Sequence, residues 1–107
     1  MTKILIVDDA EFLRVRLTKI LSAEGYEVFQ AENGVKAVAT YQESHPDVVL
    51  MDVTMPEMDG LTALKEIIQL DPKAKVVMLT ALGQESVVLE AVKSGAKDFV
   101  VKPFEQD

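Results

Sequence analysis

Short apolar runs alternate along the chain with longer segments in which apolar residues recur at helical spacing. Each run ends abruptly at a charged or turn-forming residue, a pattern that favours strands buried on both faces. The predicted strands are Ile4–Val7, Tyr26–Ala31, Val48–Asp52, Val76–Leu79 and Phe99–Val101. The second of these strands is the most polar, and we therefore expect it at an edge of the sheet.

The segments between the strands are predicted to be helices, because their apolar residues fall three or four positions apart. They begin near Ala10, Val35, Leu61 and Gln84, and end before Gly25, Pro46, Pro72 and Gly95. The two glycines are expected to act as C-terminal caps. The apolar face of the first helix carries Leu13, Leu17, Ile20 and Leu21, and the residues expected to face inward in the fourth are Val88, Ala91 and Val92. Regular alternation of strands and helices predicts a parallel sheet with helices on both faces.

Composition and charge limit the kinds of protein that the chain can be. Its 107 residues make one domain with an aliphatic core, since 49% of them are hydrophobic and only 6% aromatic. The absence of cysteine excludes disulfides and cysteine-bound zinc. A net charge of -7 argues against nonspecific binding to nucleic acid or to an anionic membrane. No apolar stretch approaches the ~20 residues that span a bilayer and no signal peptide opens the chain, so we expect a soluble, cytoplasmic protein.

Polar residues terminate four of the five predicted strands: Asp8 with Asp9, Asp52, Thr80 and Lys102. Because the carboxyl ends of parallel strands share one edge of a sheet, we expect these side chains to converge. Each has an ordinary explanation when taken alone. Asp8, Asp9 and Thr80 fit helix caps, Asp52 fits a turn, and Lys102 fits a solvated strand end. Their combination at one edge favours a site over these separate explanations.

Three carboxylates at one edge repel each other by about 4 kcal/mol per pair at ~4 Å and an effective dielectric constant of ~20. Lys102 is the only candidate cation at this edge, so a hard divalent cation is expected. Mg²⁺ binds one or two carboxylates together with water and phosphate oxygens. Asp9 and Asp52 are expected to be direct ligands, and Asp8 a ligand directly or through water. The first strand–helix turn has no glycine, unlike the loops that bind nucleotide phosphates.

With these residues the chain resembles the receiver domains of two-component response regulators, particularly the small single-domain regulators of chemotaxis. The matching pieces are Ile4-Leu5-Ile6-Val7-Asp8-Asp9, Asp52-Val53-Thr54-Met55-Pro56 with Asp59-Gly60, Leu79-Thr80-Ala81, and Phe99-Val100-Val101-Lys102-Pro103-Phe104. The resemblance implies one receiver domain over residues 1–107. It also implies a flavodoxin-like three-layer α/β sandwich, with a five-stranded parallel sheet in the order 2-1-3-4-5.

The resemblance also implies roles for single residues. Asp52 would accept a phosphoryl group from a sensor histidine kinase, and Mg²⁺ would be held by Asp8, Asp9, Asp52 and the backbone carbonyl of Thr54. Lys102 would pair with one phosphate oxygen, and the Thr80 hydroxyl would donate to another. Phosphorylation adds a charge of about -1.5 to -2.

The added charge would draw in Thr80 and turn Phe99 inward, which switches the surface of the fourth helix and fifth strand. That surface would bind a target such as the flagellar motor switch. The alternative interpretation is that Phe99 is simply a core residue.

Receiver domains have a fifth helix beside the first, and this chain ends before such a helix. We therefore expect a receiver domain truncated after strand five, as a truncated or engineered form. Apolar surface is expected to be exposed at Val100 or Val101 and on neighbours in the fourth strand. Because exposed apolar patches commonly become interfaces, either a homo-oligomer through this face or marginal stability is predicted.

Two other interpretations fit part of the pattern. A Mg²⁺-dependent phosphohydrolase with an aspartyl nucleophile, of the haloacid-dehalogenase type, requires a second Asp two positions after the nucleophile, where this chain has Thr54. A receiver fragment of a multidomain transcriptional regulator would share every motif quoted above. We expect a phosphoacceptor signalling domain rather than an enzyme, with at most self-phosphorylation and self-dephosphorylation.

Overall fold

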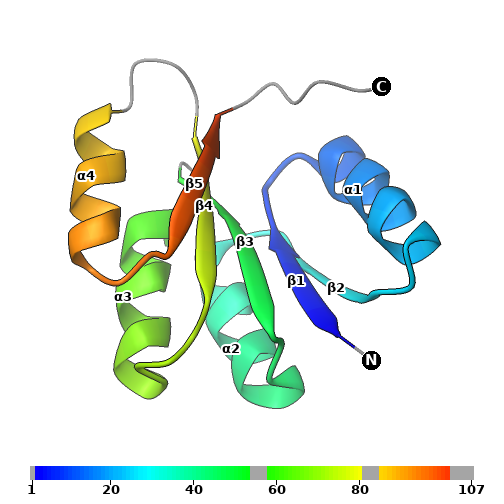
Figure 1. Ribbon diagram of the computed structural model, residues 1–107, viewed down its shortest axis with the longest axis horizontal. Coiled ribbons are helices and arrows are strands. Elements are labelled where there is room, and N and C mark those ends of the chain that lie inside the picture. The colour runs from blue at the N-terminus through cyan, green and yellow to red at the C-terminus, as the bar shows by residue number, and fades with distance from the viewer. Residues whose placement is uncertain (1, 54–57, 81–84, 102–107) are drawn as a thin grey trace.

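The computed structural model describes residues 2–53, 58–80 and 85–101, which form five strands and four helices in alternation (Figure 1). In chain order the elements are β1 Lys3–Val7, α1 Glu11–Ala23, β2 Glu27–Ala31, α2 Gly34–Ser44, β3 Val48–Asp52, α3 Gly60–Leu70, β4 Val76–Thr80, α4 Glu85–Lys93 and β5 Asp98–Val101. The predicted strands and helices are confirmed, with small shifts at their ends. The start predicted for the fourth helix, at Gln84, lies outside the described residues.

All neighbouring strands are parallel, in the order β2-β1-β3-β4-β5. This confirms the predicted flavodoxin-like sheet, including the position of the polar strand β2 at an edge. The direction of strand order reverses at β1, where Ile6 lies opposite Gln30 of β2 on one side and Leu50 of β3 on the other. Open α/β sheets bind ligands outside the carboxyl ends of the strands at such a reversal.

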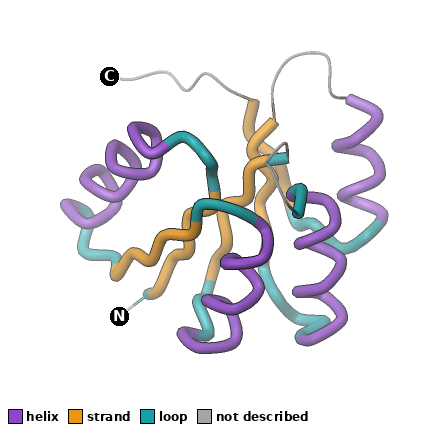
Figure 2. The backbone as a smooth tube through the Cα atoms, turned by 180° about the vertical axis from the view of Figure 1, so that it is seen from behind, coloured by secondary structure: helices purple, strands orange, loops and turns teal. Residues whose placement is uncertain are grey.

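Helices α2, α3 and α4 cover one face of the sheet, whereas α1 covers part of the other face beside β1 and β2 (Figures 1 and 2). The main core lies under the three helices. It joins alternate residues of the central strands to small and aliphatic helix residues, namely Leu5, Val7, Val49, Met51, Val76 and Met78 with Ala37, Ala63, Leu64, Ile67 and Ala91. None of the helices in the described ranges has the length and apolar character needed to span a bilayer.

Local side-chain chemistry determines where several helices start and stop. Asn33 and Asp59 cap α2 and α3, because their side chains accept hydrogen bonds from the N–H groups of Lys36 and Thr62, each at 2.8 Å. Gly25 and Gly95 follow α1 and α4 with φ angles of 94° and 117°. This left-handed backbone confirms that they end the helices as predicted.

One predicted helix face is wrong in detail. Val88 and Ala91 of α4 are buried as expected, but Val92 is 46% exposed. Val87 is also packed against the core, so the buried stripe is centred on Ala91. Because successive residues are about 100° apart around a helix, Val92 lies outside this stripe. In α1 the same geometry leaves Ile20 39% exposed at the margin of a half-buried face.

Apolar side chains are exposed at the β5 edge of the sheet. Phe99, Val100 and Val101 are 44%, 42% and 41% exposed, which confirms the predicted exposure of the two valines. The expectation for the fourth strand is wrong for Leu79, which is buried, while Val77 is half-buried. Leu79 is therefore not part of the exposed apolar surface at this edge.

Candidate functional site

Asp8 lies directly after β1 and is held by the neighbouring backbone. Its N–H donates to the carbonyl of Ala31 at 3.2 Å, which extends the β1–β2 pairing by one step. Its carboxylate oxygen Oδ1 accepts from the N–H of Ala10 at 2.9 Å. Asp8 is only 1% exposed, whereas Asp9, the next residue, is exposed. This turn therefore offers one buried and one exposed carboxylate at the edge of the sheet.

Asp52 is the last residue of β3 and is 5% exposed. Its backbone is enclosed by the start of α3, where the Gly60 N–H donates to the Val53 carbonyl at 2.9 Å. A Cβ atom added at Gly60 would lie 1.9 Å from the Asp52 carbonyl oxygen. Position 60 therefore requires glycine, because any side chain would collide with the backbone that carries Asp52.

The carboxylates of Asp8, Asp9 and Asp52 converge, as the sequence predicted. One oxygen from each residue lies within 4.8 Å of the others, which makes the three a group able to hold a metal ion. The donors are hard oxygen atoms on two buried residues and one exposed residue. Mg²⁺ prefers such donors and retains water at its open positions, so the residues present fit this metal.

Thr80 ends β4 at the same edge of the sheet. Leu79 lies opposite Asp52, so Thr80 is one step beyond the phosphoacceptor candidate, and it is 2% exposed. Its partner on β5 is Val101, the residue before Lys102. Lys102 itself and the Thr54 carbonyl lie outside the described residues, as does the loop 81–84. The predicted convergence is thus observed for the carboxylates of Asp8, Asp9 and Asp52, and Thr80 ends a strand at the same edge of the sheet.

Comparison with known proteins identifies the family. Residues 4–107 match the response regulator receiver domain. The chain belongs to this family. Receiver domains act in two-component phosphorelay signalling. The fold described above is in keeping with that assignment, and so is the acidic edge formed by Asp8, Asp9 and Asp52.

Among its relatives, the receiver domain is 57% identical to the chemotaxis protein CheY of Bacillus subtilis, over 98% of this chain and 88% of that protein. It is 54% identical to CheY of Thermotoga maritima, over 96% of this chain and 87% of that protein. A crystal structure of a CheX–CheY complex with BeF3 and Mg²⁺ from Borrelia burgdorferi matches 97% of this chain and 80% of the solved chain. That match has a TM-score of 0.92 at 41% identity.

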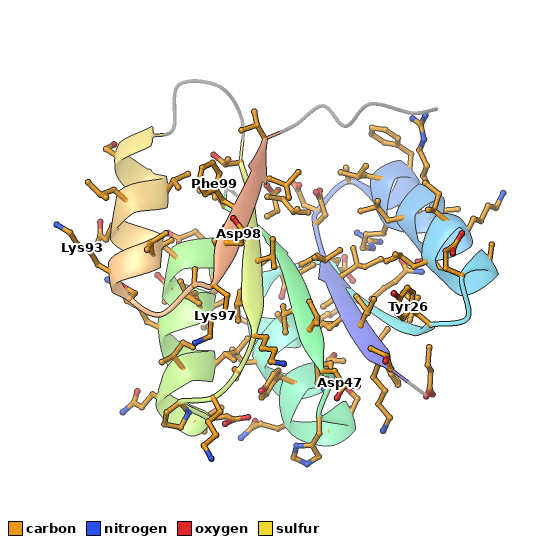
Figure 3. The ribbon with its side chains drawn as sticks, in the orientation of Figure 1. Tyr26, Asp47, Lys93, Lys97, Asp98 and Phe99 are labelled. Atoms are coloured by element: carbon orange, nitrogen blue, oxygen red, sulfur yellow. The ribbon has the colours of Figure 1, made fainter. Side chains whose placement is uncertain are left out.

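Phe99 of the receiver domain is a surface residue rather than a core residue. It lies opposite Met78 on β5, and its side chain is on the α4 side of the strand (Figure 3). At 44% exposure, the interpretation of Phe99 as a plain core residue is wrong. Because Met78 and Thr80 point to the same face of β4, Phe99 lies on the face that also carries Thr80.

One residue at the site was missed from the sequence. Arg14 belongs to α1, and its side chain reaches back to the end of β1. Its Nη1 donates to the carbonyl of Asp8 at 2.5 Å, and its Nε donates to Oε1 of Gln30 on β2 at 3.1 Å. The sequence feature that could have indicated this contact is an arginine in the first turn of the helix that follows Asp8 and Asp9.

Proposed function

We propose that this receiver domain accepts a phosphoryl group on Asp52 from a sensor histidine kinase, with Mg²⁺ bound, and signals in chemotaxis. The observation that carries the proposal is the convergence of three carboxylates within 4.8 Å around a buried Asp52 at the end of β3. Family membership supports phosphorelay signalling, and similarity to CheY proteins supports chemotaxis.

Asp8, Asp9 and Asp52 would hold the metal, and the Thr54 carbonyl would add a fourth oxygen. When bound, Mg²⁺ neutralises charge on the carboxylates and on the transferring phosphoryl oxygens. Support for this metal comes from the donor set and from the Borrelia CheY complex, which contains Mg²⁺. A bound metal would offset the repulsion among these carboxylates, two of which are nearly inaccessible to water.

Asp52 acts as the nucleophile. A carboxylate oxygen attacks phosphorus, an O–P bond forms, and the N–P bond of the kinase phosphohistidine breaks with its electron pair going to the imidazole nitrogen. Burial of Asp52 keeps the carboxylate oriented and limits access of water to the acyl phosphate. Lys102 would pair with a phosphoryl oxygen and the Thr80 hydroxyl would donate to another.

The output follows from these contacts. Drawing Thr80 toward the phosphoryl group changes the packing on the face that it shares with Phe99. Phe99 would then turn inward from its 44% exposed position and alter the surface formed by α4 and β5. The partner proposed for this surface is a downstream target such as the flagellar motor switch. The sensor histidine kinase would bind at the acidic edge instead. The chemistry is limited to acceptance and slow loss of the domain's own phosphoryl group.

Intact mass spectrometry tests the proposal directly. The protein is incubated with acetyl phosphate or phosphoramidate, with Mg²⁺ or with EDTA. We expect a mass increase of one phosphoryl group that requires Mg²⁺ and is absent in Asp52→Asn. Phosphorylation that persists in Asp52→Asn would overturn the assignment of the acceptor. Steady turnover of a phosphate ester such as p-nitrophenyl phosphate would favour the phosphohydrolase interpretation instead.

A further inference from the structure

The side chain of Arg14 joins three elements at the acidic edge. It belongs to α1, it donates to the Asp8 carbonyl at the end of β1, and it donates to Gln30 on β2. Arg14 is half-buried, and its backbone carbonyl accepts a hydrogen bond from the Thr18 hydroxyl at 2.7 Å. A planar guanidinium with two separate acceptors has a single orientation, so both of its partners hold it in place.

The contact with the Asp8 carbonyl acts on two metal-ligand candidates at once. This carbonyl belongs to the peptide bond between Asp8 and Asp9. Because a peptide group is planar, the direction of its carbonyl also determines the direction of the Asp9 N–H and the position of both α-carbons. Arg14 therefore determines how the buried Asp8 and the exposed Asp9 are oriented relative to each other.

Arg14 also brings a positive charge to the edge where the carboxylates converge. The effect of this charge extends to Glu32 after β2. The pKa of Glu32 is lowered mainly by its hydrogen bond with the Lys36 ammonium and by the positive charge of Lys36. The charge of Arg14 makes a smaller contribution in the same direction.

We propose that Arg14 is a positioning residue of the metal site, holding the Asp8–Asp9 peptide in the orientation that lets both carboxylates meet Asp52. The inference rests on the proposed function, since it requires a metal at this site. Arg14 itself touches neither the metal nor the phosphoryl group in this scheme. Its effect is transmitted through one backbone carbonyl.

Variants at two arginines of the same helix test the proposal. Arg14→Met removes the guanidinium with little loss of side-chain volume. Arg16→Met makes the same change at an exposed position two residues away and is the matched control for lost charge. Arg14→Lys keeps the charge but cannot span both acceptors. Binding is measured as free Mn²⁺ by electron paramagnetic resonance, because Mn²⁺ takes the same oxygen ligands as Mg²⁺ and is detected without phosphorylation.

We expect Arg14→Met to weaken Mn²⁺ binding about tenfold or more, as is typical when the partner of a metal ligand is lost. Arg14→Lys should bind with intermediate affinity, and Arg16→Met should stay within about twofold of the original chain. Equal affinity of Arg14→Met and the original chain would overturn the inference. So would an equal loss in Arg16→Met, because the effect would then be one of net charge alone.

A second measurement needs no metal. In metal-free protein, amide hydrogen exchange at Asp8 and Ala10 should be faster in Arg14→Met, while exchange at Ala37 and Ala63 in the helices of the other face stays unchanged. Unchanged exchange at Asp8 and Ala10 would contradict the positioning role. If Arg14→Met does not fold, the Gln30→Leu variant tests the inference, because it removes the second acceptor of Arg14. Unchanged Mn²⁺ binding in that variant would overturn the inference. If the original chain does not bind Mn²⁺, the proposed function fails as well, whereas a failure of Arg14 alone leaves it intact.

Discussion

Two of the three carboxylates at the acidic edge are buried, whereas aspartate side chains are usually exposed to solvent. Asp8 and Asp52 are 1% and 5% exposed, although ionised aspartates are seldom buried without partners. Asp8 is partly compensated by the Ala10 N–H. Their carboxylate oxygens lie within 4.8 Å of one another and of Asp9, and like charges at such distances repel. At the residue scale, a bound cation would reduce this repulsion.

Asp52→Asn is expected to stabilise the metal-free protein. Removing one charge from the cluster should raise the free energy of unfolding by about 1 to 3 kcal/mol, a fraction of the full repulsion at short distance. The measurement is urea unfolding in EDTA, with Glu43→Gln on the exposed face of α2 as the control for net charge. A lower stability of Asp52→Asn than of the control would contradict unfavourable crowding of the three carboxylates.

A second prediction concerns Tyr41 and Asp71, which lie at the opposite end of the sheet from the acidic edge. The Tyr41 hydroxyl donates to Oδ2 of Asp71 at 2.7 Å, and this bond is the main reason why the pKa of Asp71 is lowered. A lowered carboxyl pKa in the folded state contributes stability above the ordinary value of 3.8, and this contribution is lost as the pH falls below it. Tyr41→Phe should therefore reduce the free energy of unfolding at pH 7, and the difference should shrink below pH 3.8.

The control for this prediction is Tyr26→Phe, because Tyr26 is the other tyrosine and is 38% exposed. Urea unfolding of the three proteins between pH 7 and the acid limit of folding gives the comparison. A difference between Tyr41→Phe and the original chain that is independent of pH would exclude ionised Asp71 as the partner that matters.

At the scale of elements, the start of α3 determines the position of the phosphoacceptor. Asp59 caps the helix, and the next residue, Gly60, approaches the backbone of Asp52 and Val53 too closely for a side chain. The start of α2 is attached to the same region, since the Gly34 N–H donates to the Met58 carbonyl at 3.1 Å. Two helix starts therefore hold the backbone that follows β3.

Gly60→Ala tests this coupling between a helix start and the site. Overpacking against the Asp52 carbonyl should destabilise the fold by about 1 to 3 kcal/mol or more. It should also slow phosphorylation by acetyl phosphate about 10- to 100-fold, because displacement of a reacting group by about 1 Å has effects of that size. The control is Asp59→Ala, which should cost about 1 kcal/mol by loss of the cap while the phosphorylation rate is retained. Similar rates in both variants would mean that Gly60 affects stability alone.

At the scale of the whole molecule, the two faces of the sheet are covered unequally. Within the described residues, three helices shield one face, whereas α1 shields the β1–β2 side of the other (Figure 1). Val100 on β5 lies opposite Leu79 and is 42% exposed on this less protected face, whereas the similarly exposed Phe99 and Val101 point to the other face of the same edge strand. Exposed apolar side chains on an edge strand favour association with another surface.

We expect the protein to self-associate through this face as its concentration rises. Size-exclusion chromatography with light scattering should show a mass above that of the monomer at high concentration, and Val100→Lys should shift the population toward monomer. Val35→Lys is the matched control, because Val35 is also exposed, at 50%, but lies on α2. A monomer at every concentration would contradict this expectation.

The helices and strands of this protein could be predicted from its sequence because the patterns that specify them are local. Apolar runs, helical spacing and cap residues such as Gly25 and Gly95 predicted the elements, since backbone conformation and burial act over a few neighbouring residues. The acidic edge was also predictable, because parallel strands must place Asp8, Asp9 and Asp52 at one edge.

Only the tertiary structure decided which side chains of a helix meet a partner and how closely backbones approach. Val92 was placed inward by spacing alone, yet the rotation of α4 about its axis depends on its contacts with β4 and α3. The link from Arg14 to the Asp8 carbonyl and the contact of Gly60 with Asp52 join residues whose distance is set by how α1 and α3 dock on the sheet. Sequence periodicity defines a helix face only to within about one residue, or 100°. The arrangement of the carboxylates at the site therefore depends on packing that no local pattern specifies.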